Sequence, residues 1–196
     1  MKTKTQEERS ASTRRALLDA TVACLAEVGY AGTTSAAVAD RAGFSRGAQL
    51  HHFGSRDQLV VAAVEHLAHL RLGAVREQLS QLGAKGDAMP AGPEAALGLL
   101  AEALSGPLYA ASLELWVAAR ADPTLREELV PAEDRVNAEL AEICRTYVTD
   151  DPVEIRLTLD LLLGRGVSGL LIPHQRAHEI EALSAWTRRL TGHPRG

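Results

Sequence analysis

The sequence predicts an all-α protein with a three-helix head at the N-terminus, a larger helical body behind it and about nine helices in all. Aromatic residues make up only 4% of the 196 residues, whereas Ala and Leu are abundant, and this balance favours helix over sheet. Hydrophobic residues make up 46% and charged residues 23%, which is typical of a globular protein. Apolar residues recur at helical spacing, and no stretch shows the alternation that indicates a strand.

The first predicted helix covers residues 12–28, after a polar segment, residues 1–10, that we expect to be flexible. Its apolar positions repeat at the spacing of one helix face, and Gly29 follows them as a C-terminal stop. These positions are Leu17, Leu18, Cys24, Leu25 and Val28. We therefore expect an amphipathic helix with one buried face.

Two short helices come next, at residues 35–42 and 45–52, and hydroxyl residues before each can cap its N-terminus. The remaining helices are expected at residues 56–82, 94–104, 108–121, 123–148, 152–172 and 176–190. A loop is expected at residues 83–93 by composition, and Pro131 should kink or break the helix that contains it. The chain thus reads as a succession of helices with short connections.

Residues 34–53, TSAAVADRAGFSRGAQLHHF, have the pattern of a helix-turn-helix. Ala39 is small enough to let two helices cross closely, and Gly43, four positions later, can adopt the unusual backbone conformation of the turn. The apolar positions that can bury the helix pair are Val38, Ala42, Phe44 and Phe53. Residues 1–60 carry a net charge of +2, from eight Lys/Arg and six Asp/Glu, against −6 for the rest of the chain. A basic head on an acidic body suits a head that meets phosphate.

The stretch RRALLDATVACLAEVGYAGTTSAAVADRAGFSRGAQLHHFGSRDQLV resembles the DNA-binding head of the TetR (tetracycline-repressor-like) family. The matching elements are Gly29-Tyr30, Thr33-Thr34, Val38-Ala39, Ala42-Gly43-Phe44-Ser45, Arg46-Gly47-Ala48, His52-Phe53 and Ser55-Arg56 through Leu59. The rest of the chain resembles the family only in its helical pattern and length. The resemblance implies a DNA-binding domain at residues 1–55 and an effector-binding and dimerisation domain at residues 56–196.

The resemblance also implies which positions contact DNA. They are Thr34, Ser35, Ser45, Arg46, Gly47, Ala48, Gln49, Leu50, His51, His52 and Arg56. Thr34 and Ser35, at a helix N-terminus, would hold phosphate through hydroxyl and N–H groups. Arg46, Gly47 and Ala48 would face base edges in the major groove, where a guanidinium can grip guanine O6 and N7.

The end of this recognition helix departs from the family in one place. His51 and His52 would lie near the DNA backbone, and Arg56 stands where the family usually has a phosphate-gripping Lys. Gln49-Leu50 replaces the common Leu-Tyr, an inward apolar residue followed by a tyrosine that touches DNA. Either the helix is slightly rotated, so that Leu50 packs and Gln49 reaches the DNA, or Leu50 meets a thymine methyl.

In the resembled family, the body forms a dimer, and the last two helices are the expected interface. The candidate dimer residues are Leu163, Gly166, Val167, Leu170, Leu183, Trp186 and Leu190. Glycine inside a helix costs up to about 1 kcal/mol relative to Ala, so the glycines at residues 164–169 call for a reason. Close helix packing supplies one, either across the dimer or within the protomer.

The family's body also encloses an effector pocket. The candidates are polar-tipped side chains and a leucine on apolar helices: His66, His69, Tyr109, Leu113, Trp116 and Arg120. A plain core stripe with an emerging arginine explains four of them equally well, because residues 109, 113, 116 and 120 share one helix face. The Leu, Val and Ala around them favour an apolar effector.

The sequence gives no support for an enzyme, a cofactor or a metal site, since it has no serine elbow, P-loop or dinucleotide fingerprint. His174 and His178 are four apart but lack further ligands at convincing spacing, so surface histidines are the better interpretation. Cys24 and Cys144 form no C-x-x-C pair and are expected to be buried thiols. No signal peptide or apolar stretch of transmembrane length is present, so we expect a cytoplasmic protein without membrane contact.

The sequence therefore predicts a ligand-responsive DNA-binding regulator of transcription, a repressor that binds a palindromic double-stranded operator as a homodimer. Effector binding would swing the helix at residues 56–82 and change the spacing of the two recognition helices from one DNA turn, roughly 34–36 Å. The alternative is a helical ligand-binding or adaptor protein with a vestigial helix-turn-helix, which only the Gln49-Leu50 departure supports. Activation in place of repression stays open, because the sequence does not encode where the operator lies.

Overall fold

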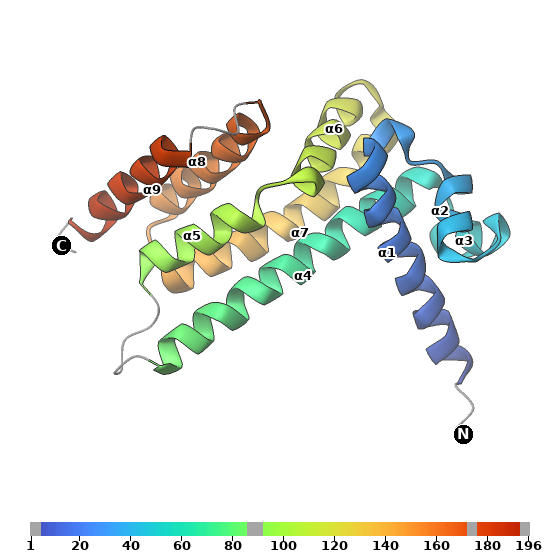
Figure 1. Ribbon diagram of the computed structural model, residues 1–196, viewed down its shortest axis with the longest axis horizontal. Coiled ribbons are helices and arrows are strands. Elements are labelled where there is room, and N and C mark those ends of the chain that lie inside the picture. The colour runs from blue at the N-terminus through green and yellow to red at the C-terminus, as the bar shows by residue number, and fades with distance from the viewer. Residues whose placement is uncertain (1–4, 86–91, 172–175, 193–196) are drawn as a thin grey trace. The chain divides into compact units, whose positions relative to one another are not determined.

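The structure is a computed structural model that describes residues 5–85, 92–171 and 176–192, and these ranges contain helices and no strand (Figure 1). The nine helices in these ranges are α1 (Gln6–Gly32), α2 (Ser35–Ala42), α3 (Arg46–Phe53), α4 (Arg56–Lys85), α5 (Pro93–Ala103), α6 (Pro107–Ala121), α7 (Pro123–Tyr147), α8 (Pro152–Leu171) and α9 (Arg176–Thr191). Side chains are not described for residues 84, 85, 171 and 176–180. The predicted all-α fold class is confirmed.

The first helix begins earlier than predicted, whereas the stop predicted at Gly29 is present as a break within α1. It begins at Gln6, because Thr5 and Glu8 form a capping box in which the Thr5 hydroxyl accepts from the Glu8 N–H at 3.2 Å. The expectation of a flexible segment is therefore wrong for residues 6–10. At the other end the helix breaks at Gly29, where φ is 67° and ψ is −174°, and one more turn follows. Val28, expected on the buried face, is exposed beside this break.

The helix α7 continues through Pro131, so of the expected kink or break the break does not occur, and a kink stays a prediction. Proline removes one backbone donor from the helix ladder and clashes with the preceding turn. The buried side chains of Leu129 and Ala132 flank Pro131, and their packing holds the helix together there.

The chain divides into two compact units, and each is described here by itself. The first consists of Met1–Leu67 and Ala110–Glu133. Within it, α1 packs against α2, and α2 packs against α3 (Figure 1). Its core contains Leu17, Leu18, Ala20, Cys24, Val38, Phe53, Leu59 and Ala63. The three short apolar patterns of the head are thus joined into one small core by the start of α4.

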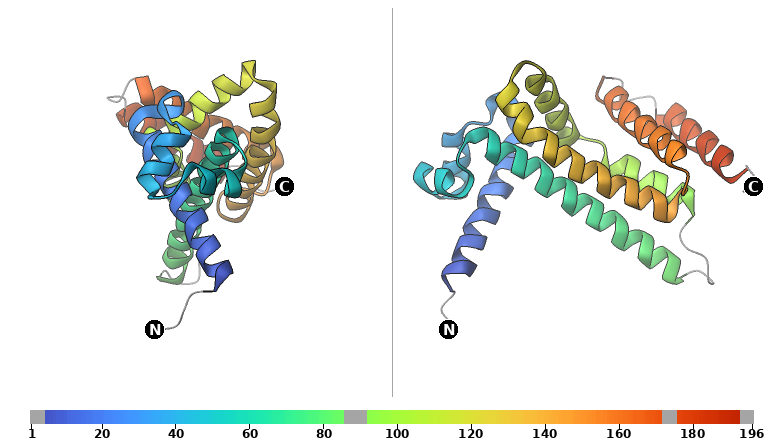
Figure 2. Two further views of the ribbon diagram at one scale, coloured as in Figure 1. Left: turned by 90° about the vertical axis from the view of Figure 1, so that its right-hand side faces the viewer. Right: turned by 180° about the vertical axis from the view of Figure 1, so that it is seen from behind.

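The second unit consists of Ala68–Tyr109 and Asp134–Gly196. Its core draws buried side chains from α4, α5, α7 and α8, namely Leu72, Val75, Leu79, Ala96, Leu97, Leu100, Ala101, Leu140, Ile143, Cys144, Val148, Ile155, Leu159 and Leu162. Helix α9 covers this core and lies beside α8 (Figure 2). The unit boundaries fall inside helices, so the functional division at residues 55 and 56 stays a prediction. Across the described ranges, no individual helix combines the length and hydropathy needed to cross a membrane.

Candidate nucleic-acid interface

Two N-caps set the beginnings of the short helices. The Thr34 hydroxyl oxygen accepts from the Ala37 N–H at 3.2 Å and starts α2. The Ser45 hydroxyl oxygen accepts from the Ala48 N–H at 3.2 Å and starts α3. Each cap satisfies one of the backbone donors that the first helical turn leaves without a carbonyl. Helix α2 therefore begins where the sequence predicted, and α3 begins one residue later than predicted, because Ser45 is its N-cap.

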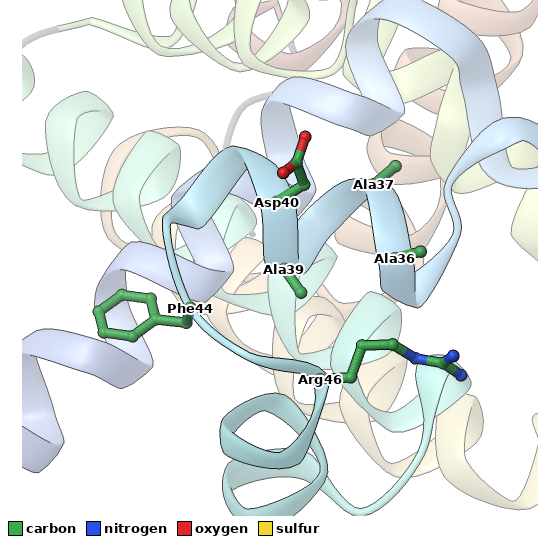
Figure 3. A pocket seen from close by; sticks show the side chains of 6 residues that line it. All are labelled: Ala36, Ala37, Ala39, Asp40, Phe44 and Arg46. Carbon is green, nitrogen blue, oxygen red and sulfur yellow. The ribbon is translucent and has the colours of Figure 1, made fainter.

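The turn between α2 and α3 depends on Gly43, whose φ of 73° lies in the left-handed region. Val38 and Ala39 on α2 are buried, so the two helices cross closely as the sequence predicted. Phe44, in contrast, was expected to bury the pair, and it is 37% exposed. The left-handed glycine turns the chain outward at this point, so the ring stands away from the helix crossing (Figure 3).

The beginning of α3 is open to solvent. Arg46, Gly47, Leu50 and His51 are exposed, and Ala48 is half-buried. Arg46 borders an open hollow that is also lined by Ala36, Ala37, Ala39, Asp40 and Phe44. Figure 3 shows the Arg46 side chain extending along α2 below Ala36 and Ala39. The guanidinium therefore stands at the outer edge of the helix-turn-helix.

The structure decides how Gln49 and Leu50 are placed. Gln49 is fully buried, and its amide N–H donates to the Ser55 carbonyl at 3.4 Å. Its Oε1 has no hydrogen-bond partner among the described residues. Leu50 is 51% exposed. The expectation that Gln49 contacts DNA is wrong, because position 49 still points into the head and only position 50 faces outward.

Arg56 was expected to grip phosphate, but the structure uses its guanidinium inside the head. The Nε–H donates to the Thr33 carbonyl at 2.7 Å, and a terminal N–H donates to the Tyr30 carbonyl. The other terminal nitrogen lies 3.0 Å from Asp57 Oδ1. The guanidinium also stacks over the Tyr30 ring, 4.3 Å from its centroid. Arg56 therefore joins the start of α4 to the last turn of α1 and to Thr33, and its role as a phosphate contact stays a prediction.

Tyr30 takes part in the same set of contacts as Arg56. It was not singled out from the sequence. Its hydroxyl donates to Asp57 Oδ1 at 3.2 Å. Burial raises the pKa of the Tyr30 phenol above its ordinary value, against the opposing effect of Arg56, so the phenol stays protonated and able to donate. The Gly29-Tyr30 pair in the motif was a signal for this residue, but its partners on α4 are 26 and 27 positions away.

Arg14 is a second residue that sequence reasoning missed. One guanidinium N–H donates to the His52 carbonyl at 3.0 Å, and the guanidinium carbon lies 4.2 Å from the centroid of the Phe53 ring. His52 is half-buried and its ring meets that of His51 edge-on. Arg14 thus ties the C-terminal end of α3 to α1, while His51 remains exposed on the same outer side as Leu50.

The six effector-pocket candidates are divided between the two units, four in the first and two in the second. In the first unit, Trp116 donates to Glu133 Oε1 at 2.7 Å, and His66 lies 3.9 Å from Asp19 Oδ1. Leu113 is half-buried and Arg120 is exposed on the same helix. None of these four lines the hollow of Figure 3.

The other two candidates belong to the second unit. His69 Nδ1 lies 2.6 Å from Glu139 Oε2. Tyr109 is buried, and its hydroxyl donates to the Leu163 carbonyl at 2.8 Å. These contacts join helices of the unit to one another, so Tyr109 has a packing role and its role as a pocket residue stays a prediction.

The dimer candidates divide into two groups. A Cβ at Gly166 would lie 2.5 Å from the Tyr109 ring and 2.6 Å from the Leu104 carbonyl, so this glycine serves packing within the protomer and not across a dimer. Leu183, Trp186 and Leu190 are partly buried against the protomer's own core. Leu163 is half-buried, whereas Val167 and Leu170 are exposed. His174 and the side chain of His178 lie outside the described residues.

Comparisons with known proteins agree with this geometry. The sequence model of a family described as bacterial regulatory proteins, tetR family, matches residues 17–63, which contain all of α2 and α3. An HTH-type transcriptional regulator of Mycobacterium tuberculosis is 32% identical over 183 residues, covering 90% of this chain and 92% of that protein. CymR of Pseudomonas putida, also an HTH-type transcriptional regulator, is 34% identical over 167 residues, covering 85% of this chain and 73% of CymR.

A solved structure shows a similar fold. The multidrug binding protein EbrR in complex with proflavin aligns with a TM-score of 0.60 at 25% identity, over 89% of this chain and 99% of EbrR. The similarity therefore extends beyond the helix-turn-helix and through the helices of both units.

Proposed function

Because the chain belongs to the TetR family of bacterial transcriptional regulators, we propose that it is a repressor that binds a palindromic operator as a homodimer and is released by a small molecule. Its relatives regulate transcription through a helix-turn-helix and are not enzymes. The sign of regulation, the symmetry of the operator and the effector are parts of the proposal.

The observation that carries the proposal is the outward face of α3. Arg46 is exposed at the first position of the helix, and Gly47 beside it has no side chain to keep the helix from the bases. A guanidinium there can donate to guanine O6 and N7 in the major groove. Leu50 and His51 continue the same exposed surface, and Leu50 suits contact with a thymine methyl. The outward face is thus complete without Gln49, which removes the support for a vestigial head.

The beginning of α2 supports a phosphate contact beside this face. Thr34 is exposed and caps the helix, and the amides of Ser35 and Ala36 have no carbonyl to donate to within the helix. Backbone donors at a helix N-terminus, together with the positive end of its dipole, favour a phosphate oxygen. We place the phosphate contact at these amides and the hydroxyls of Thr34 and Ser35.

Dimerisation is proposed along α8. Val153, Leu157, Asp160, Gly164 and Val167 follow helical spacing on one face and are exposed, and three of them are apolar. A Cβ at Gly164 would meet no atom within 4 Å, so no packing contact among the described residues explains that glycine. A second copy packed closely on this face would bury the apolar side chains and give Gly164 its reason. Leu170 lies at the edge of the same face and is also exposed.

The effector is proposed to be a largely apolar compound bound in the helical body. The helices of the second unit are rich in Leu and Ala. EbrR, which shares the fold, is a multidrug binding protein and was solved in complex with proflavin. Binding of such a compound would favour a conformation in which the recognition helices no longer match one turn of DNA.

The test is a fluorescence-anisotropy titration of the DNA that flanks the protein's own gene, at two salt concentrations. We compare wild type with Arg46→Ala and with Arg126→Ala, which removes an exposed arginine from α7 in the same unit. Wild type and Arg126→Ala should bind tightly, with an affinity that falls steeply as salt rises. Arg46→Ala should bind about tenfold or more weakly and lose preference for the operator over unrelated DNA.

Equal binding of all three proteins would show that Arg46 does not read bases. If neither the flanking DNA nor a selection from random sequences yields a specific site for the folded dimer, the proposed function is wrong. A helical ligand-binding protein would then be the remaining interpretation.

A further inference from the structure

The break at the end of α1 is held by a residue from a distant helix. At Gly29, a Cβ would lie 2.6 Å from Oε2 and 2.9 Å from Oε1 of Glu114, which belongs to α6 in the same unit. The next amide, the N–H of Tyr30, donates to Glu114 Oε2 at 2.6 Å. The φ of 67° therefore favours glycine at this position, and a Cβ there would displace the Glu114 carboxylate.

The helix dipole does not account for this carboxylate. A helix C-terminus carries partial negative charge, which disfavours an anion nearby. The specific bond from the Tyr30 amide, which the break at Gly29 frees from the helix ladder, is what holds the carboxylate at this end. The break itself is closed by Thr33, whose buried hydroxyl donates to the Gly29 carbonyl at 2.8 Å. The geometry therefore places a charged acceptor from α6 on the Tyr30 amide.

Tyr30 connects Glu114 with the residues at the start of the helix-turn-helix. Its amide is bound by Glu114, whereas its carbonyl and ring are bound by Arg56. The same guanidinium holds the carbonyl of Thr33, which directly precedes the N-cap of α2. A continuous chain of contacts thus runs from α6 to the first residue of the helix-turn-helix, without passing through the interior of α4.

We infer that Glu114 is a positioning residue for DNA binding, which fixes the start of α2 through Tyr30 and Arg56. The role in DNA binding rests on the proposed function, but the positioning of α2 does not. A change that moves α6 away from Gly29 would break the bond between Glu114 and the Tyr30 amide. The bonds of Arg56 to Tyr30 and Thr33 would then weaken, and the first turn of α2, where we place the phosphate contact, would become less ordered. Movement of α6 thereby reaches the head by a route separate from a swing of α4.

The experiment compares Glu114→Ala and Glu114→Gln with Glu127→Ala, which removes an exposed carboxylate of α7 in the same unit. Amide hydrogen exchange is followed across residues 30–42, together with the thermal midpoint and operator binding. Glu114→Ala should speed exchange in this segment about tenfold and weaken operator binding about tenfold, a size typical of coupled sites. The amide oxygen of Glu114→Gln can still accept from Tyr30, so this variant should restore much of both properties.

Glu127→Ala should behave as wild type in every measurement. If Glu114→Ala exchanges in residues 30–42 like Glu127→Ala, the inference is overturned, whatever happens to DNA binding. If Glu114→Ala unfolds, Glu114→Gln is compared with Glu114→Asp, whose shorter side chain withdraws the carboxylate. The amides of residues 30–42 should then exchange more slowly in Glu114→Gln than in Glu114→Asp. If wild type binds no DNA but Glu114→Ala still exchanges faster in residues 30–42, the proposed function is wrong. The positioning role of Glu114 is then retained.

Discussion

The head and the second unit hold their helices together in different ways. In the head, polar side chains bind backbone groups at helix ends: Thr34 and Ser45 cap α2 and α3, and Arg56 binds the carbonyls of Tyr30 and Thr33 at the end of α1. In the second unit, a larger core of buried Leu, Ala, Val and Ile side chains joins α4, α5, α7 and α8, and Arg71 adds bonds to the Ala103 and Ser105 carbonyls at the end of α5. The difference teaches why one region is recognisable in the sequence and the other is not.

A bond to a backbone group at a helix end requires a particular side chain at a particular position. An apolar core requires only side chains of suitable volume on the right face, and several residues serve equally well. The head therefore leaves a motif, whereas the second unit leaves only helical periodicity. Four changes can break or sharpen this comparison.

The largest effect is expected for Leu100→Ala in α5, where the side chain is fully buried in the second unit. Removing it leaves a cavity and should lower the free energy of unfolding by about 3 kcal/mol. Urea denaturation measures this change, and Leu82→Ala serves as control because Leu82 is half exposed on α4. A loss below about 1 kcal/mol, or an equal loss for both variants, would contradict an apolar core as the main support of this unit.

Arg56→Lys should cost about 2 kcal/mol, because an ammonium cannot bind two carbonyls, a carboxylate and a ring at once. The thermal midpoint should therefore fall, while Arg126→Ala should leave it unchanged. An unchanged midpoint for Arg56→Lys, together with operator binding as strong and as dependent on salt as in wild type, would support the phosphate-gripping role expected from the sequence.

Gln49→Met should stabilise the head by about 1 kcal/mol, because it removes a buried carbonyl oxygen that has no partner among the described residues. The bond that is lost to Ser55 is long, at 3.4 Å. Gln78→Met, at an exposed position of α4, is the matched control in thermal denaturation. A destabilised Gln49→Met variant would show that the bond to Ser55 outweighs the unpaired oxygen.

The smallest effect concerns Glu139, a polar exception in the second unit. Burial alone would raise the pKa of its carboxyl, but Arg76 at 2.5 Å and His69 at 2.6 Å together lower it. The folded state thus favours the carboxylate, so its contribution is present above the ordinary pKa of Glu and is lost as the pH falls through the lowered value. Wild type should exceed Glu139→Gln in stability by less than about 1 kcal/mol at neutral pH, since the pair is partly exposed. The thermal midpoints of wild type and Glu139→Gln should converge as the pH is lowered. A difference that persists at acidic pH would contradict the contribution assigned to the Glu139 carboxylate.

The sequence by itself determined the features that depend on neighbours three or four positions away. The N-caps at Thr34 and Ser45, the left-handed turn at Gly43 and the bounds of most helices follow from such local rules. The segment that contains these caps also carries the resemblance that identified the family. Its local hydrogen bonds require particular residues at particular positions. Even the start of α1 has a local cause, the capping box at Thr5, although the apolar pattern begins later.

Only the tertiary structure decided what several of the named side chains do. Arg56 finds its partners 23 and 26 positions back, and Glu114 reaches Tyr30 across 84 positions, so neither role has a signal in local spacing. Gln49 is turned inward because its side of α3 faces the head, and Gly166 packs on Tyr109 of another helix. Helical periodicity says that a residue lies on a face, but the packing of distant helices decides what that face meets.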